Sequence, residues 1–143
     1  MIIRGFLLGD APFFPGRVSI ASHEGRVWFL ADTGATRTLL LDHDAQALGL
    51  TMSELEPASL HLTGIGGSVR PFVAREADVQ FTSTESIEVP WRQDLLVVRP
   101  NAAEVTPGEV ACIRRLPSLL GRDFLRRFRF VCDCRSGEVL LER

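Results

Sequence analysis

Hydrophobic and polar residues alternate along much of the chain, in short runs that turn residues separate. In residues 69–81, Val73, Ala77, Val79 and Phe81 fall mostly on one face if successive side chains point to opposite sides. A strand with one buried face and one hydrated face has this pattern. Similar short runs cover residues 2–8, 17–22, 26–31, 59–63, 87–91 and 94–99. Their spacing predicts an all-β fold with tight connections.

Two short helices are expected between the strands. Asp42 can cap a helix over residues 43–48, and Gly49 can end it in the left-handed conformation that glycine adopts at little cost. A second helix is expected from Arg122 to about Arg127. The predicted fold is therefore all-β with one or two short helices.

The last part of the chain predicts a closing hairpin. Residues 128–134 and 138–142 are strand-like and flank a turn at residues 135–137 that ends in glycine. Upstream, residues 100–108 combine Pro, Asn, Glu and Gly, which indicates a surface loop rather than a linker. We therefore expect a single domain over residues 1–143.

Composition narrows the class of protein. Of the 143 residues, 45% are hydrophobic and 24% are charged, which is ordinary for a soluble globular domain. No apolar run approaches the roughly 18 residues that a membrane span needs. The apolar stretch that follows Arg4 is also too short for a secretory signal. We expect a cytoplasmic protein without a membrane partner.

Charge gives no general reason to expect a nucleic acid partner. The formal net charge is -2, and all 16 basic residues are arginine. Six of them gather between Arg114 and Arg129, where Asp123 alone opposes them. No recognised nucleic-acid-binding motif accompanies this cluster. A solvated basic face is therefore preferred to a nucleic acid site.

The cysteine content argues against a disulfide framework. Cys112, Cys132 and Cys134 make an odd count, and we expect reduced thiols that are buried or half-buried. Cys132 and Cys134 would share one face of a strand, but a zinc site needs two further ligands that the scattered histidines do not provide. No metal or other cofactor is expected.

Three segments that lie far apart in the sequence carry the candidate chemistry. They are residues 27–41, with Asp-Thr-Gly-Ala between two apolar runs, residues 62–67, which are rich in glycine, and residues 119–125, which read Leu-Leu-Gly-Arg-Asp-Phe-Leu. Asp-Thr-Gly alone appears by chance in on the order of a few per cent of chains this long. In this order and context, the three segments resemble the retropepsin family of single-domain aspartic peptidases over about residues 26–141.

The resemblance implies a closed acid-protease barrel and an aspartic endopeptidase. Such enzymes hold a water between two carboxylates that share one proton, so that one acid accepts a proton from the water while the other polarises the scissile carbonyl. Two like charges about 3 Å apart cannot both ionise. The chain has a single Asp-Thr-Gly, so Asp32 is the implied catalytic residue and a second copy must supply its partner. A homodimer that cuts peptides or proteins follows.

The resemblance implies that the residues after Asp32 support the catalytic carboxylate. The Thr33 hydroxyl would hydrogen-bond backbone across the dimer axis, although Thr33 can also be read as an ordinary β-branched strand residue. Gly34 lets the backbone approach the carboxylate and substrate without a side chain in the way. Ala35 is small for a similar reason.

The glycine-rich segment resembles the family's flap, the hairpin tip that closes over substrate. Gly64, Gly66 and Gly67 would permit a flexible tip whose amides bind substrate backbone, and Ile65 would cover the cleft. The alternative is an ordinary glycine-rich hairpin turn. The Asp-Thr-Gly upstream favours the flap.

The third segment resembles the strand and helix that pack behind the catalytic loop. From the residues alone, Leu119 and Leu120 are both expected in the core. The resemblance instead implies that one of them, Leu119, lies in the wall of a substrate pocket, which predicts an apolar cleavage preference. Gly121 should allow close packing against the loop that carries Asp32. Thr36 stands where retroviral enzymes carry an acid that pairs with the arginine of this segment. Arg122 therefore needs another partner, either Asp123 or an acid of the second subunit.

Two questions stay open in the sequence. The terminal runs at residues 2–8 and 139–141 can interleave between subunits or complete a sheet within one. A second hypothesis for function keeps the fold and discards the chemistry, giving a catalytically silent dimer that captures an extended peptide by strand addition. The intact Asp-Thr-Gly favours the peptidase, because a pure binder has no evident need for paired acids.

Overall fold

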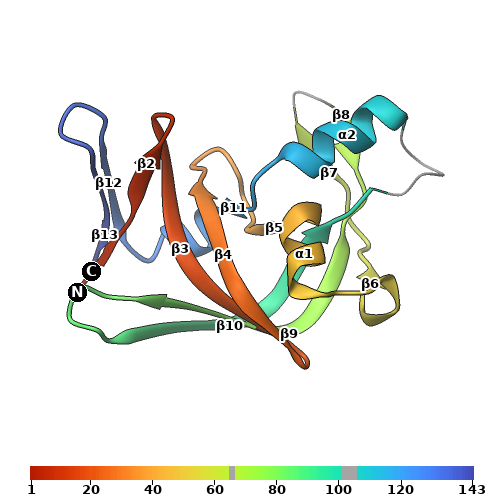
Figure 1. Cartoon of the computed structure of the whole chain (residues 1–143), viewed down its shortest axis with the longest axis horizontal. Coiled ribbons are helices and arrows are strands. Elements are labelled where there is room, and N and C mark those ends of the chain that lie inside the picture. The colour runs from red at the N-terminus through yellow and green to blue at the C-terminus, as the bar shows by residue number, and fades with distance from the viewer. Residues whose placement is uncertain (65–66, 101–105) are drawn as a thin grey trace.

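The computed structural model describes residues 1–64, 67–100 and 106–143 (Figure 1). The strands are β1 (Ile2–Arg4), β2 (Phe6–Leu8), β3 (Ala11–Ile20), β4 (His23–Ala31), β5 (Leu39–Leu41), β6 (Glu56–Pro57), β7 (Leu62–Gly64), β8 (Gly67–Val69), β9 (Phe72–Thr82), β10 (Glu88–Val98), β11 (Leu119–Leu120), β12 (Arg129–Asp133) and β13 (Glu138–Glu142). The helices are α1 (Asp42–Leu48), α2 (Pro107–Arg115), α3 (Arg122–Leu125) and the 3₁₀ turn η1 (Met52–Glu54). The chain is mostly β, as its alternating pattern predicts.

A closed barrel forms the body of the molecule. The largest sheet has the strand order β2-β3-β4-β11-β5-β10-β9-β6, and an additional pairing of β3 with β9 closes the circle. Six strands, from β3 through β4, β11, β5 and β10 to β9, thus form a barrel without free edges (Figure 1). The arrangement confirms the predicted barrel.

One position in β9 departs from the predicted face. Ala74, Ala77, Val79 and Phe81 are buried, whereas Val73 points to the other side and is only half-buried. The register between β9 and β10 shifts between Ala74 and Ala77, where two residues of β9 stand opposite one residue of β10. This β-bulge reverses the alternation, so the prediction for Val73 is wrong.

Aromatic side chains fill the barrel. Phe29, Phe81 and Phe124 are fully buried, and the Phe81 and Phe124 rings lie 4.8 Å apart between centroids. Phe124 also contacts the half-buried Trp91, at 4.9 Å. Burial of each such ring contributes about 1.5–3 kcal/mol. The short helix α3 therefore anchors the segment after β11 to the core.

Helix α1 starts differently from the prediction. Asp42 is the first helical residue rather than the cap, the N-cap is Leu41, and no side chain caps the helix. The Asp42 side chain instead lies buried and accepts a hydrogen bond of 2.8 Å from Nε of Arg99. Gly49 ends the helix with φ of 82°, which confirms the predicted left-handed end.

Helix α2 was not anticipated by the sequence pattern, which placed residues 100–108 in a surface loop. Residues 101–105 of that loop lie outside the described ranges, but α2 already begins at Pro107, a residue suited to the first helical position. The helix packs against α1. None of the helices described here is long and apolar enough to cross a membrane.

A second, three-stranded sheet has the order β1-β13-β12. The β12–β13 hairpin confirms the predicted closing hairpin, with Phe130 opposite Leu141. Strand β1 pairs antiparallel with β13 of the same chain, and the ladder continues to the termini, where the Met1 amino group donates to the Arg143 carbonyl at 2.8 Å. Figure 1 shows the two ends side by side. The terminal strands thus complete a sheet within one chain.

The cysteine prediction is wrong for two of the three residues. Cys132 and Cys134 are exposed, because β12 is an edge strand and Cys134 lies in the turn after it. Desolvation raises the pKa of the Cys132 thiol, and its hydrogen bond with Cys134 acts in the same direction. The thiol form is therefore favoured at Cys132.

Candidate active site

Asp32 follows β4 directly, in the loop of residues 32–38 that we call the Asp32 loop. Strand β11 runs parallel to β4 and antiparallel to β5, so it fills the space between the two strands that this loop connects. The Asp32 amide donates to the Leu120 carbonyl at 3.0 Å, and the Leu30 amide donates to the Ser118 carbonyl at 2.8 Å. Residues 118–120, which are distant in the sequence, therefore hold the start of the loop.

The Asp32 carboxylate is fixed by its own loop. It is half-buried, and Oδ1 accepts a hydrogen bond of 2.9 Å from the Gly34 amide. The Ala35 amide donates to the Asp32 carbonyl at 3.2 Å. A Cβ at Gly34 would lie 3.2 Å from Oδ1, a tight contact. Glycine therefore lets the loop turn closely around the carboxylate.

Thr33 and Gly34 are exposed, whereas Ala35 is half-buried. The backbone of Thr33 is held from behind, because its carbonyl accepts a hydrogen bond of 2.8 Å from Nη1 of Arg122. The predicted bond of the Thr33 hydroxyl crosses between subunits and stays a prediction.

Within the chain, Arg122 does not pair with Asp123, and the alternative of an acid from a second subunit stays a prediction. Its guanidinium contacts the Thr33 carbonyl rather than Asp123, and its amide donates to the Ala35 carbonyl at 2.9 Å. Asp123 is engaged by Thr38 instead. The expectation of an Arg122–Asp123 pair is therefore wrong, and Arg122 supports the Asp32 loop through backbone.

Thr38 and Asp123 join the end of the loop to α3. The buried Thr38 donates to Asp123 from its amide at 3.0 Å and from its hydroxyl at 2.8 Å, and the same hydroxyl accepts from the Gly121 amide at 3.0 Å. A Cβ on Gly121 would lie 2.5 Å from the carbonyl carbon of Arg37. Glycine at position 121 is thus required by the close approach of the two backbones.

The sequence reasoning gave no role to Thr38 or Ser118. Both are buried polar residues beside apolar runs, a combination that indicates a structural hydrogen bond. The Ser118 hydroxyl accepts from the Leu41 amide at 2.9 Å and donates to Asp44 at 2.6 Å. Their polar character was visible in the sequence, but their partners lie more than seventy residues away.

A row of apolar side chains crosses the sheet beside Asp32. Leu119 pairs with Leu30 on one side and with Leu39 on the other, and Leu39 pairs with Leu96. Cross-strand partners share one face of a sheet. Leu30, Leu119 and Leu39 are half-buried, whereas Leu120 next to them is fully buried in the core. The half-buried leucines therefore present apolar surface next to the carboxylate.

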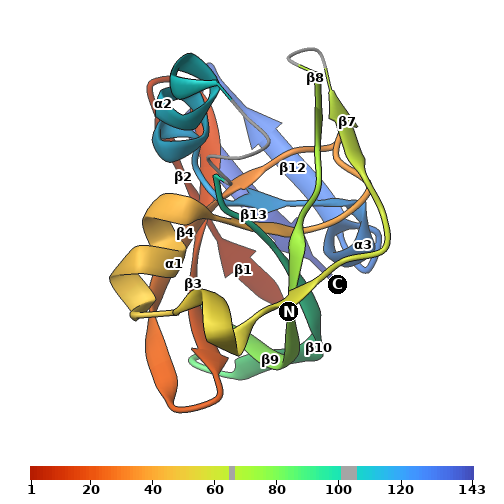
Figure 2. The ribbon, with the colours of Figure 1, turned by 90° about the vertical axis from the view of Figure 1, so that its right-hand side faces the viewer.

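The glycine-rich segment forms a hairpin of β7 and β8. Thr63 and Ser68 stand opposite each other, with their hydroxyl oxygens 3.0 Å apart. Gly64 and Gly67 form the last described pair, and the predicted tip residues Ile65 and Gly66 lie outside the described residues. Figure 2 shows this hairpin projecting from the barrel. The role of this hairpin as a flap stays a prediction.

The described residues contain no group of three or more His, Cys, Asp or Glu side chains arranged to hold a metal ion. The polar side chains described around the Asp32 loop include Asp32 itself, Thr38 with its partner Asp123, and the two arginines Arg37 and Arg122.

A closed β-barrel whose Asp-Thr-Gly loop joins two strands with β11 between them is the arrangement of a retropepsin-like aspartic protease. The chain belongs to the family described as "gag-polyprotein putative aspartyl protease", whose model matches residues 17–127. A sequence search against curated proteins finds no match.

Solved structures agree with this family. The EIAV protease complexed with the inhibitor HBY-793 is 18% identical, with 85% of this chain and 91% of that chain covered at a TM-score of 0.53. A retropepsin-like aspartic protease from Rickettsia conorii is 22% identical, with 99% and 88% covered and a TM-score of 0.53. At these identities the likeness is one of fold, and it confirms the retropepsin-like barrel.

Proposed function

We propose that the protein is an aspartic endopeptidase that acts as a homodimer, with one Asp32 from each subunit. The observation that carries the proposal is the Asp32 carboxylate, half-buried, fixed by the Gly34 amide at 2.9 Å and bordered by half-buried leucines. A carboxylate in this position has little structural purpose of its own. It is suited to act on a substrate laid across the sheet.

The reaction is hydrolysis of a peptide bond by water. The ionised Asp32 of one subunit takes a proton from the water, whose oxygen attacks the scissile carbonyl, while the protonated Asp32 of the other subunit donates to the carbonyl oxygen. Collapse of the tetrahedral intermediate breaks the C–N bond, and the leaving amine takes the proton that the first Asp32 received from the water, while the second Asp32 regains its proton from the intermediate. These reaction steps need no metal or cofactor.

Dimerisation completes the site because one chain contributes one acid. A two-fold axis beside Thr33 and Gly34 would bring the two Asp32 carboxylates together. The exposure of both residues is consistent with such a contact. Arg122 would then strengthen the interface indirectly by holding the Thr33 carbonyl in place.

The substrate is an extended peptide with apolar side chains near the cut. Leu30, Leu119 and Leu39 form a half-buried apolar row that can accept such side chains. The β7–β8 hairpin would close over the peptide as a flap and bind its backbone through amide groups.

The test is the nearly isosteric substitution Asp32→Asn, assayed with a library of unstructured fluorogenic peptides at mildly acid pH. We expect the variant to keep its fold and oligomeric state and to lose cleavage, with Asp10→Asn, an exposed turn aspartate, as the matched control that stays active. Equal cleavage by the Asp32 variant and the parent would reject the assignment. Tight peptide binding by the parent without product would instead assign the silent binding module.

A further inference from the structure

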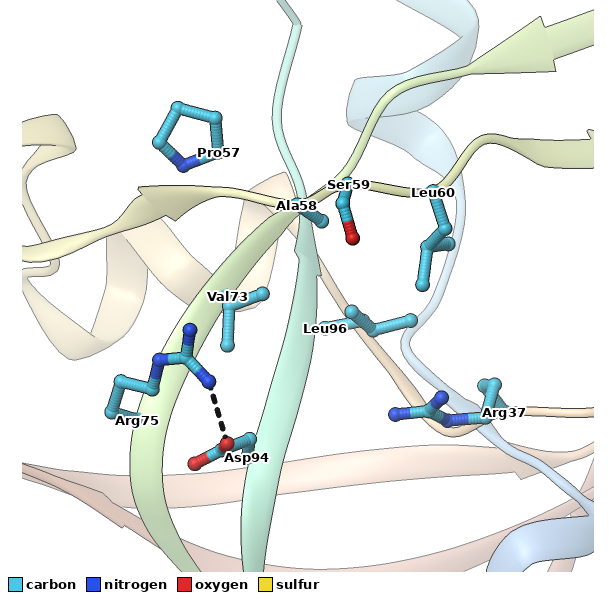
Figure 3. A pocket seen from close by; sticks show the side chains of 9 residues that line it. All are labelled: Arg37, Pro57, Ala58, Ser59, Leu60, Val73, Arg75, Asp94 and Leu96. Atoms are coloured by element: carbon cyan, nitrogen blue, oxygen red, sulfur yellow. Dashed lines mark hydrogen bonds and ion pairs between the residues drawn. The ribbon is translucent and has the colours of Figure 1, made fainter.

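A pocket of about 300 Å³ opens on the sheet beyond the leucine row (Figure 3). Its floor is apolar, formed by Val73 of β9 and Leu96 of β10, and the segment with Ser59 and Leu60 forms one wall. Arg37 of the Asp32 loop stands at one end. The pocket is thus lined by the same loop that carries Asp32.

Strand register gives the distance between the pocket floor and Leu30, at the end of β4 beside the Asp32 loop. Leu30 precedes Asp32 by two residues and is linked through Leu119 and Leu39 to Leu96 by successive cross-strand pairs. Three steps between strands, at about 4.8 Å each, span about 14 Å. An extended peptide covers that distance in about four residues at roughly 3.3 Å per residue. A peptide cut at Asp32 would therefore bring its fourth residue or so to the pocket.

At one end of the pocket a single arginine, Arg75, is shared by two carboxylates, so this end keeps a net negative charge. Arg75 donates to Asp94 at 2.8 Å and to Glu56 at 2.9 Å, and these two acids raise its pKa. Asp94 also accepts from the Glu76 amide at 3.0 Å, so both of its oxygens are engaged. Among the described residues, this end therefore offers no free cation to a ligand.

Arg37 at the other end is only loosely paired. Its Nε lies 3.7 Å from Oδ2 of Asp123, and its side chain is 44% exposed. Asp123 already accepts from the amide and hydroxyl of Thr38 and from the Phe124 amide. In Figure 3 the Arg37 guanidinium points toward the pocket, and the Ser59 hydroxyl points toward Leu96. The pocket therefore combines an apolar floor with one available cation and a hydroxyl.

We propose that this pocket selects an acidic side chain of the substrate, about four residues from the scissile bond, with Arg37 as the specificity-determining residue. The inference rests on the proposed peptidase function. The methylenes of a glutamate would pack on Val73 and Leu96, and its carboxylate would meet Arg37 and the Ser59 hydroxyl. In a symmetric dimer the pocket recurs on both sides of the cut, so the acid can precede or follow it.

The experiment compares peptides that are identical except for Glu, Gln or Lys placed three to five residues from the cut. We expect the parent to cleave the best-placed Glu peptide about two- to fivefold more efficiently in kcat/KM than its Gln counterpart, with the advantage shrinking at high salt. In Arg37→Gln the Glu to Gln ratio should fall to about one, and in Arg37→Glu the Lys peptide should become the preferred one. Arg129→Gln, on β12 and away from the pocket, should keep the parental ratio.

The outcomes separate the two proposals. Cleavage of the peptides with no preference for Glu, or with a preference that Arg37→Gln leaves intact, overturns the acidic pocket while the peptidase stands. If the parent cleaves none of them, the peptidase proposal fails, and the pocket is judged by fluorescence anisotropy of the same labelled peptides. Equal affinity of the parent for the Glu and Gln peptides then overturns the pocket as well.

Discussion

The carboxylate of Asp123 accepts two hydrogen bonds from a single residue, Thr38, one from its amide and one from its hydroxyl. Thr38 is buried and ends the Asp32 loop, whereas Asp123 lies in α3. The pair therefore ties the loop to the helix that Phe124 anchors in the barrel.

Removal of this acceptor should destabilise the protein. Asp123→Ala leaves the buried amide and hydroxyl of Thr38 without their partner, at a cost of about 1–3 kcal/mol. We expect the melting temperature to fall by several degrees, measured by circular dichroism. Glu88→Ala, an exposed change on β10, should leave it nearly unaltered. An unchanged melting temperature in Asp123→Ala would show that the pair does not hold the loop.

The close approach at Gly121 predicts a loss of both stability and activity. In Gly121→Ala the new methyl group would lie 2.5 Å from the Arg37 carbonyl carbon, so β11 and the Asp32 loop must move apart. We expect a destabilisation of about 1–3 kcal/mol by urea unfolding together with reduced cleavage of the peptide library. Gly108→Ala in α2, where the added Cβ stays 4.0 Å from Thr106, should be neutral or slightly stabilising. Parental stability and activity in Gly121→Ala would contradict this account.

The buried pair of Asp42 and Arg99 should be sensitive to removal of one partner. Their side chains are 2% and 12% exposed, and Arg99 also donates to the Leu50 carbonyl at 2.7 Å. Arg99→Ala leaves the buried carboxylate with a hydrogen bond from Gln46 at 2.7 Å and with Arg114 at 3.7 Å, so we expect a cost at or below the low end of the roughly 3–5 kcal/mol typical of a broken buried pair. The exposed pair of Arg129 and Glu142 supplies the comparison, since Arg129→Ala should cost at most about 1 kcal/mol. Similar urea midpoints for the two variants would show that Arg99 does not stabilise the buried Asp42 carboxylate.

Asp94 predicts a specific pH dependence of stability. The hydrogen bond from the Glu76 amide, and then that from Arg75, lower the pKa of Asp94 below its ordinary value, which is about 3.9. A lowered pKa in the folded state stabilises the fold above the ordinary value, and this contribution is lost as the pH falls through the lowered pKa. We expect the parent to lose more stability than Asp94→Asn between about pH 6 and about pH 2.5. Parallel urea titrations of the two proteins would disprove the contribution of Asp94.

The sequence predicted the elements that depend on local pattern. Alternation marked most strands, Gly49 marked the end of α1, and the turn before β13 marked the closing hairpin. The close packing of Gly121 also followed, from the resemblance of residues 119–125 to the family segment that packs behind the catalytic loop.

The sequence missed features that depend on distant partners. Asp42 looked like a helix cap because its interaction with Arg99, 57 positions away, is invisible locally. Arg122 was expected to pair with a carboxylate, but Thr38 occupies Asp123 and leaves Arg122 to the Thr33 carbonyl. The predicted face of Val73 was wrong because the pattern of apolar residues does not show where a β-bulge interrupts the strand.

The bulge at Arg75 and Glu76 sets which face of β9 the side chains before it occupy. It lies in β9, across the sheet from the Asp32 loop, yet it decides that Val73 faces the pocket rather than the core. Loss of one of these two residues would restore simple alternation along β9. The side chains before the bulge would then exchange faces, so that Val73 would turn from the pocket to the core. A change of length at this one point would thus alter the lining of the pocket and leave the loop that carries Asp32 unchanged in sequence.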